Sequence, residues 1–169
     1  LDEIRMVALD ERSLTSAALL KLLFQGRFRP GVQFKVLFPD PVTQLQTFDA
    51  VLIIGDKEFE MRHRFKPYRV YDLSEEWYRE TGKPFVHAVL AARKEIKLPE
   101  SLSQVFNEAL NRAPETISKI SETHAAPLML SVAQCADYLK NKILYHFNLE
   151  TQSGLDHFRT LCLQKGLIK

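Results

Sequence analysis

The sequence predicts an α/β fold with a mostly parallel sheet, followed by a helical segment. In residues 1–92, apolar runs of strand length alternate with stretches of helical periodicity. In residues 93–169, helical periodicity dominates. The sequence shows no internal repeat, and no flexible linker separates the two parts. Strands that alternate with helices form right-handed βαβ units on a parallel sheet. We therefore expect two structural parts, with a boundary near residues 90–96.

The first part contains five runs with strand character. They are apolar, often rich in β-branched residues, and separated by Gly, Pro or charged residues. These strand-like runs are "IRMVAL" (4–9), "QFKVLF" (33–38), "DAVLII" (49–54), "YRVYD" (68–72) and "PFVHAVLAA" (84–92). Helices are expected between them over 14–26, within "GDKEFEMRHRF" (55–65), and over 73–81.

The second part reads as a series of helices. Helical periodicity runs through "ESLSQVFNEALNRA" (100–113), "PETISKISETH" (114–124) and "LSVAQCADYLKNKI" (130–143). A final helix is expected over 150–166, after a short extended piece at 143–147.

Composition limits the class of protein and its partners. The 169 residues are 46% hydrophobic and 26% charged, as in globular proteins. With 23 basic and 21 acidic residues and a net charge of +2, we expect neither nucleic acid nor a membrane as the main partner. No apolar run approaches the roughly 20 residues of a membrane span. Cys135 and Cys162 lie in no CxxC or Cys/His cluster, so we expect no zinc site and a cytoplasmic, reducing location.

The stretch "SLTS" (13–16) is the strongest candidate for a binding site. It lies where the first predicted strand leads into a helix, and parallel α/β sheets bind ligands at this edge. A helix N-terminus carries free N–H groups and a partial positive charge, which attract carboxylates and phosphates. Ser13, Thr15 and Ser16 supply only hydroxyls there, with no acidic residue to occupy the amides. The alternative is that Ser13 is simply an N-cap.

Two further strand ends carry candidate residues. Gly55 and Asp56 follow the most apolar strand, and Asp72 closes the strand at 68–72. Either aspartate could instead cap the helix that follows it. The sequence contains no GxGxxG, Walker, GxSxG or HExxH motif, and His and acidic residues show no metal-ligand spacing. The residues alone thus predict an anion-binding α/β domain without a metal or organic cofactor, and they assign no catalytic residue.

Four segments resemble, in order and spacing, the chorismate dehydratases of the futalosine route to menaquinone. They are "VALDERSLTSAALLKLL", "DAVLIIGDKEF", "VYDLSEEWYRETGKPFVHAVLAARKE" and "ILYHFNLETQSGLDHFRTLCLQKGLI". The sister enzyme of that pathway, 1,4-dihydroxy-6-naphthoate synthase, typically has His-Glu where this chain has Gly55-Asp56. It also has Pro-Leu-Gly where this chain has Phe85-Val86-His87, so the dehydratases are favoured. Two smaller departures from the dehydratase pattern are Ser74 in place of Gly and His87 in place of an aromatic residue.

The resemblance implies a two-lobed fold like that of type 2 periplasmic binding proteins, with the substrate between the lobes. Residues 1–92 would form the second lobe, and the helical segment 93–169 would return to the first. The Ser-Tyr-Leu-Asn-like segment that opens the family's first lobe has no counterpart in this sequence. We therefore expect self-association, or docking with such an N-terminal segment, and no turnover by this chain alone.

The resemblance also implies a lyase that dehydrates chorismate to 3-[(1-carboxyvinyl)oxy]benzoate without a cofactor. In the family, hydroxyls at the helix start lie against a substrate carboxylate. Thr15 and Ser16 would have this role here, with Ser13, Gly55, Asp56 and Asp72 beside them. The alternatives are a non-catalytic lobe that binds a small carboxylate, and the sister naphthoate synthase.

Overall fold

The computed structural model describes residues 1–37 and 41–168, and the chain divides into two compact units. The first unit combines Leu1–Val86 with Asn148–Lys169, and the second unit is His87–Phe147. The chain leaves the first unit a few residues before the boundary expected at 90–96. The last helix, which we expected with the helical segment, belongs to the first unit.

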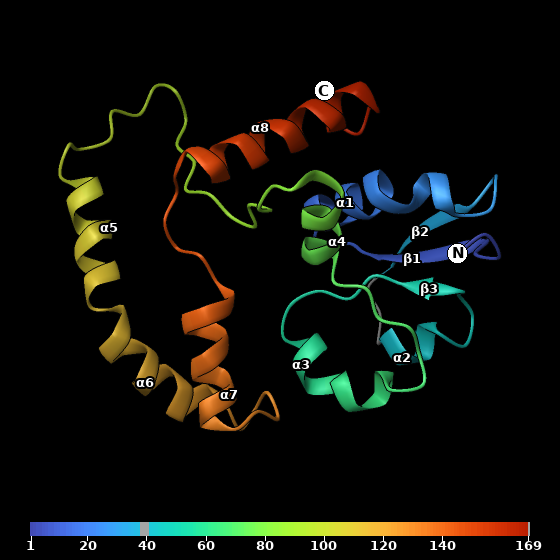
Figure 1. Cartoon of the computed structure of the whole chain (residues 1–169), viewed down its shortest axis with the longest axis horizontal. Helices are drawn as coiled ribbons and strands as arrows, with labels where there is room; N and C mark the ends of the chain where they lie inside the picture. Colours follow the sequence, from blue (N-terminus) through green and yellow to red (C-terminus); the bar gives the residue numbers. More distant parts are fainter. Residues whose placement is uncertain (38–40, 169) are drawn as a thin grey trace. The chain divides into compact units, whose positions relative to one another are not determined.

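The first unit is built on a parallel sheet of three strands, which confirms the α/β prediction (Figure 1). The order is β2-β1-β3, with β1 at Met6–Asp10, β2 at Gln33–Leu37 and β3 at Ala50–Val51. β1 lies in the centre and pairs in parallel with both neighbours. β3 is shorter than expected, although the N–H of Leu52 still donates to the carbonyl of Ala8 at 2.8 Å. Residue 38, the end of the second predicted strand, lies outside the described residues.

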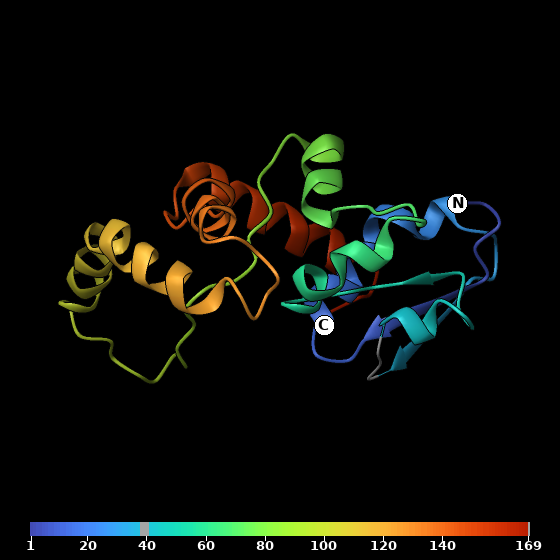
Figure 2. The ribbon, with the colours of Figure 1, turned by 90° about the horizontal axis from the view of Figure 1, so that it is seen from below.

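Helices lie on both sides of this sheet, with α1 on one side and α2 on the other (Figures 1 and 2). The helices of the first unit are α1 (Leu14–Phe24), α2 (Pro41–Gln44), α3 (Lys57–Met61), α4 (Leu73–Thr81) and α8 (Leu149–Gln164). Short 3-10 turns follow two of them, η1 at Gln25–Arg27 and η2 at Arg62–Phe65. The three helices predicted in the first part of the sequence are therefore present.

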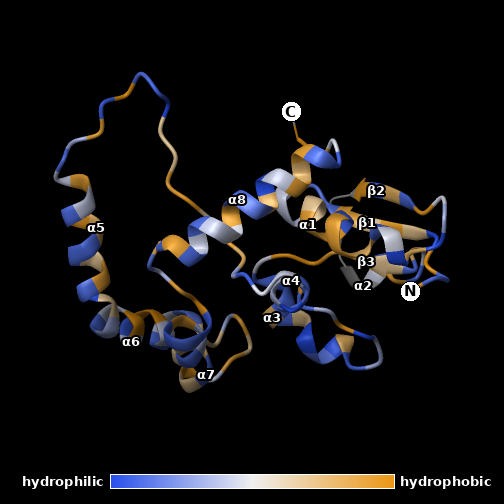
Figure 3. Ribbon diagram, turned by 45° about the horizontal axis from the view of Figure 1, so that its top comes forward, coloured by the Kyte–Doolittle hydropathy of each residue, from blue (hydrophilic) through white to orange (hydrophobic). Residues whose placement is uncertain are grey.

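The main hydrophobic core joins the sheet to α1. The strands are largely hydrophobic (Figure 3), and their buried side chains meet those of the helix. The core residues are Val7, Leu9, Leu20, Phe24, Phe28 and Leu52. The α1 residues Leu20 and Phe24 are four apart, which places them on one helix face.

A second cluster, formed by aromatic residues, attaches α8 to α4. The ring of Trp77, which is 1% exposed, lies 5.9 Å from the rings of Phe85 and Phe158 and 5.6 Å from that of His157. The backbone of α8 also approaches the chain closely at Gly154. A Cβ at this position would collide with the carbonyl oxygen of Pro84.

Two predicted strands are wrong, those at 68–72 and 84–92. Neither segment has strand hydrogen bonds in the structure. In the first, Tyr68, Val70 and Tyr71 are 45%, 68% and 40% exposed, so the apolar run reflects a surface rather than a buried strand. In the second, Phe85 packs in the aromatic cluster instead of a sheet. Apolar periodicity indicates extended backbone or burial, whereas a strand also needs a neighbour to pair with.

The second unit is helical, as expected from its periodicity. It contains α5 (Leu102–Asn111), α6 (Ala113–His124), α7 (Val132–Asp137) and the single π-helical turn η3 (Tyr138–Lys142). Its buried residues are few: Ile117, Ser121, Ala125 and Cys135. Residues 143–147, expected as an extended piece, carry no regular secondary structure, although Ile143 itself has extended dihedral angles.

Across the described ranges 1–37 and 41–168, no helix combines the length and apolarity required to cross a membrane.

Candidate functional site

The carboxyl edge of the sheet brings two of the predicted sites together. β1 and β3 are adjacent and parallel, so the residues that follow them emerge at the same edge. Ser13 follows β1 and begins α1, whereas Asp56 follows β3 and begins α3. The positive charge of Lys57 also contributes to lowering the pKa of Asp10, which places the start of α3 near the end of β1.

Ser13 is the N-cap of α1, as the simpler interpretation predicted. Its backbone is extended, with φ −137° and ψ 95°, and its Oγ accepts from the N–H of Ser16 at 3.1 Å. The Ser13 hydroxyl in turn donates to the Oγ of Ser16 at 2.8 Å. Ser13 therefore serves its own helix, and the hydroxyl proton of Ser16 can be donated to another group.

Thr15 is exposed at the start of α1, and Ser16 is half-buried. The first turn of α1 contains no acidic residue, so no carboxylate of its own neutralises the partial positive charge there. By contrast, the first turn of α4 contains Glu75 and Glu76. The N-terminus of α1 is thus the better of the two for an external anion.

An ion pair between Asp10 and Arg12 lies immediately before this helix and was missed from the sequence. Asp10 is 5% exposed at the end of β1, and its Oδ1 accepts from the backbone N–H and the Nε of Arg12 at 3.0 and 2.8 Å. A second guanidinium nitrogen bonds to Oδ2, so the contact is bidentate. The hydrogen bond from the Arg12 side chain holds the pKa of Asp10 below its ordinary value. The sequence offers only a weak signal for this pair, an aspartate at the end of a strand two residues before an arginine.

Gly55 and Asp56 lie on the surface between β3 and α3. Gly55 has a φ of +67°, a left-handed conformation that favours glycine. Asp56 occupies the N-cap position of α3, but its side chain makes no capping hydrogen bond. The predicted role as a cap is therefore not realised for Asp56, and its carboxylate lies exposed near the strand ends.

Asp72 differs from the other candidates because the strand that it was expected to close does not form. Its Oδ1 accepts from the N–H groups of Ser74 and Glu75 at 2.8 and 3.1 Å, which makes it the N-cap of α4. Any role of Asp72 in ligand binding stays a prediction.

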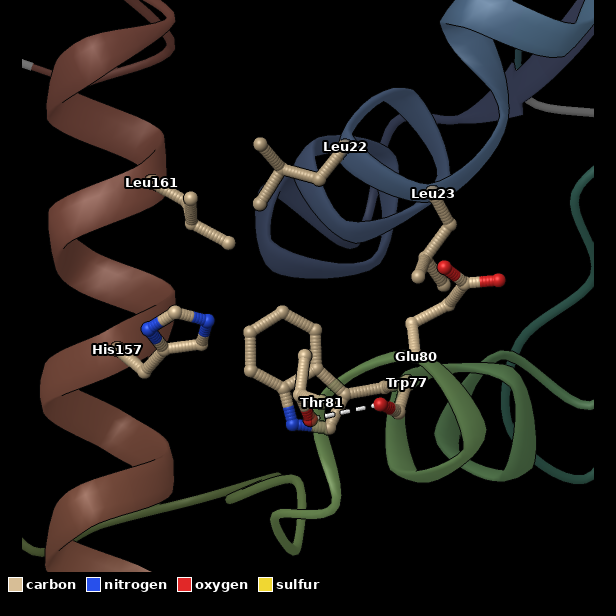
Figure 4. A pocket seen from close by; sticks show the side chains of 7 residues that line it. All are labelled: Leu22, Leu23, Trp77, Glu80, Thr81, His157 and Leu161. Carbon is tan, nitrogen blue, oxygen red and sulfur yellow. Dashed lines mark hydrogen bonds between the residues drawn. The ribbon is translucent and has the colours of Figure 1, made fainter.

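Neither of the two hollows described here is lined by these residues. One, of about 260 Å³, lies among α1, α4 and α8 (Figure 4) and is lined by Leu22, Leu23, Trp77, Glu80, Thr81, His157 and Leu161. The other, of about 300 Å³, lies beside α3 and η2. Thr15, Gly55 and Asp56 are exposed, so the strand-end residues form an open surface on the first unit. No group of three or more His, Cys, Asp or Glu residues suited to a metal ion occurs within the part of the chain that the structure describes.

The sequence profile of a family described as menaquinone biosynthesis matches residues 1–164, nearly the whole chain. The chain belongs to this family. A chorismate dehydratase from Thermus thermophilus is 32% identical over 173 aligned residues, which cover 94% of this chain. The chain spans 63% of the length of that curated relative. The match confirms the resemblance seen in the sequence and places "SLTS" within a menaquinone biosynthesis protein.

Proposed function

We propose that this chain carries the carboxylate-binding lobe of a chorismate dehydratase. The observation that supports it most is the N-terminus of α1, which lies at the carboxyl edge of the sheet with hydroxyls and no acidic residue in its first turn. The similarity to a chorismate dehydratase supplies the substrate. In this proposal the first unit corresponds to one lobe of a type 2 binding-protein fold.

The proposed reaction is the dehydration of chorismate to 3-[(1-carboxyvinyl)oxy]benzoate. The C–O bond to the ring hydroxyl breaks, a ring C–H proton is lost, and the two leave as water. The ring becomes aromatic, so the driving force lies in the substrate and no electron acceptor is needed. The protein must mainly hold the carboxylates in a fixed pose and stabilise the charge that develops as the hydroxyl leaves.

Two features of the strand edge suit a carboxylate. The amides at the start of α1 attract an anion, and the hydroxyls of Thr15 and Ser16 can donate to it. Gly55 has no side chain to prevent a ligand from approaching the backbone after β3. The Arg12 side chain, 42% exposed, lies immediately before the helix, where the carboxylate of Asp10 holds its guanidinium and offsets its charge.

The alternative functions use the same surface with a different outcome. A non-catalytic lobe would bind a small carboxylate without converting it. The sister naphthoate synthase would act on a different substrate, and the residues at Gly55-Asp56 disfavour it. We place the protein in the cytoplasm, where Cys135 and Cys162, both free and buried, would stay reduced.

The test is the double substitution Thr15→Ala/Ser16→Ala. Lost hydrogen bonds to a charged group should weaken chorismate binding by about 1–3 kcal/mol, while stability changes less because Ser13 still caps the helix. Binding is measured by calorimetry or by NMR shifts, and unfolding by urea. Thr160→Ala is the control, because this hydroxyl lies on α8 and donates to the carbonyl of Asp156 in its own helix. Loss of folding with normal affinity in the folded fraction would show that the hydroxyls are only caps.

A second experiment tests the activity of residues 1–169 as they stand. The strand-end surface is open, and catalysis by positioning needs a substrate held from more than one side. We expect no measurable formation of the aromatic product from chorismate. Because the second unit exposes Val105, Phe106, Leu144 and Phe147, we also expect self-association in light scattering. Full turnover by a monomer would contradict this placement of the site.

A further inference from the structure

The segment from Arg62 to Tyr71, "RHRFKPYRVY", concentrates positive charge on the first unit. It contains four Arg and Lys residues and one His, and it contains no acidic residue. The ribbon of η2 is largely in the hydrophilic colour (Figure 3). We call residues 62–71 the basic segment. The net charge of +2, from which we expected no membrane partner, averages over the whole chain and conceals this local excess.

Two aromatic side chains fix the basic segment on the first unit. Phe65 is buried, with 5% exposure, and the N–H of Tyr68 donates to its carbonyl at 2.8 Å. At the other end, the ring of Tyr71 packs edge-on against Phe24 of the main core, with centroids 5.4 Å apart. The segment is therefore held at both ends, and its remaining side chains form a defined surface rather than a free tail.

The charges of this surface are mostly available to a partner. Arg62 is paired with Glu58 through two contacts of 2.9 Å. Arg64, Lys66 and Arg69 are exposed and form no ion pair with any residue in the described ranges 1–37 and 41–168. Three unpaired cations thus lie within six residues of one another.

Apolar side chains alternate with these cations. Tyr68 and Val70 flank Arg69 and are 45% and 68% exposed. A hollow of about 300 Å³ lies at the same place, lined by Glu58, Arg62, Phe65, Lys66, Tyr68 and Val70. The hollow therefore combines cationic side chains with aromatic and aliphatic ones.

We propose that the basic segment binds the surface of anionic phospholipid membranes. Lys and Arg attract anionic headgroups, and tyrosine favours the membrane interface. The exposed Val70 decides between partners, because an aliphatic side chain gains by entering the acyl boundary and has no counterpart to contact along a nucleic acid backbone. The binding is peripheral, and none of the candidate strand-end residues lines the hollow beside the basic segment.

The strength of this binding follows from the number of cations. Each Lys or Arg near an anionic surface changes partitioning by about fivefold, so removing two should reduce it about 25-fold. High salt should release the protein, because the Debye length falls below the distance over which the charges act.

The experiment is co-sedimentation of residues 1–169 with vesicles of phosphatidylcholine, alone or with about one third phosphatidylglycerol. We expect binding only to the anionic vesicles. Lys66→Gln/Arg69→Gln should reduce partitioning onto the vesicles about 25-fold. Val70→Ser should reduce partitioning by a smaller factor, and this reduction should persist in moderate salt. The matched control is Arg29→Gln/Arg159→Gln, which removes two exposed cations elsewhere on the first unit that form no ion pair with a described residue.

Three outcomes would overturn the proposal. One is a failure of the unaltered chain to bind anionic vesicles. Another is an equal loss in the control variant, which would show only general attraction of a cationic protein. The third is tighter, Lys66- and Arg69-dependent binding to single-stranded DNA or to an acidic peptide than to vesicles. Circular dichroism and urea unfolding of each variant verify that the fold is unchanged.

Discussion

The contact between α8 and the chain at Pro84 makes Gly154→Ala a sharp test of the fold. A Cβ at Gly154 would lie well inside contact distance of the Pro84 carbonyl oxygen and 3.3 Å from its carbonyl carbon. Both atoms belong to the backbone, so no side chain can rotate away to make room. The helix must therefore move away from residues 83–84 to accommodate one methyl group.

The expected magnitude combines two opposing effects. Alanine is favoured over glycine inside a helix by about 1 kcal/mol. Overpacking costs about 1–3 kcal/mol, and a collision with backbone belongs in the upper part of that range. Moving α8 also stretches the 2.7 Å hydrogen bond from Lys83 Nζ to Ser153 Oγ and loosens the packing of Phe158 against Phe85, whose rings are 5.1 Å apart. We expect a net loss of about 1–2 kcal/mol in the free energy of unfolding.

The assay uses Trp77, the single tryptophan of the chain, which lies in the same aromatic cluster and is 1% exposed. Urea unfolding followed by its fluorescence reports both stability and the local packing. Gly26→Ala is the matched control, since the added Cβ would meet no atom within 4 Å beyond its own stretch of backbone and chain neighbours, and it should be neutral or slightly stabilising. If Gly154→Ala were as stable as the unaltered chain, with unchanged fluorescence, the close approach of α8 would be refuted.

Two further predictions concern buried titratable groups. Asp10→Asn should lower the free energy of unfolding at neutral pH by about 1–2 kcal/mol, because the bidentate pair with the half-exposed Arg12 loses its charge. The pKa of Asp10 is lowered in the folded state, so the charged carboxylate contributes stability above the ordinary pKa of 3.8, and this contribution disappears as the pH falls below that value. Urea unfolding of the unaltered chain and of Asp10→Asn at pH values on either side of 3.8 should show the difference in stability vanish in acid. Cys162 is fully buried, and burial raises the pKa of its thiol. In a Cys135→Ser variant, Cys162 should therefore react with a thiol reagent only as the chain unfolds in urea. Rapid reaction of the folded protein would contradict the burial of Cys162.

The helices were easier to predict than the strands because their signals are local. Asp72 and Gly82 mark the two ends of α4, with the cap hydrogen bonds at Asp72 and a φ of +65° at Gly82. The same periodicity reasoning failed for 68–72 and 84–92. A strand depends on a partner far away in the sequence, and Phe85 shows that a strand-like residue can instead be buried by distant aromatic rings.

The candidate site could likewise be predicted only where its signals are local. The position of "SLTS" at the start of a helix follows from nearby residues, and Ser13 is the N-cap. The proximity of Lys57 to Asp10 depends on the pairing of β3 with β1, which the sequence does not display. The pairing of Asp10 with Arg12 spans only two residues, but two charged residues close in sequence do not by themselves indicate a bidentate contact.

The return of the chain from the second unit to the first has a consequence for synthesis on the ribosome. The 61 residues His87–Phe147 separate the two portions of the first unit, so closing this loop costs about 3–4 kcal/mol of chain entropy. Trp77 and Phe85 are translated before the second unit, whereas their partner Phe158 on α8 is translated after it. A nascent chain thus presents a bare aromatic surface until α8 has been translated, and a chaperone that recognises aromatic side chains would find its binding site there while the second unit is being made.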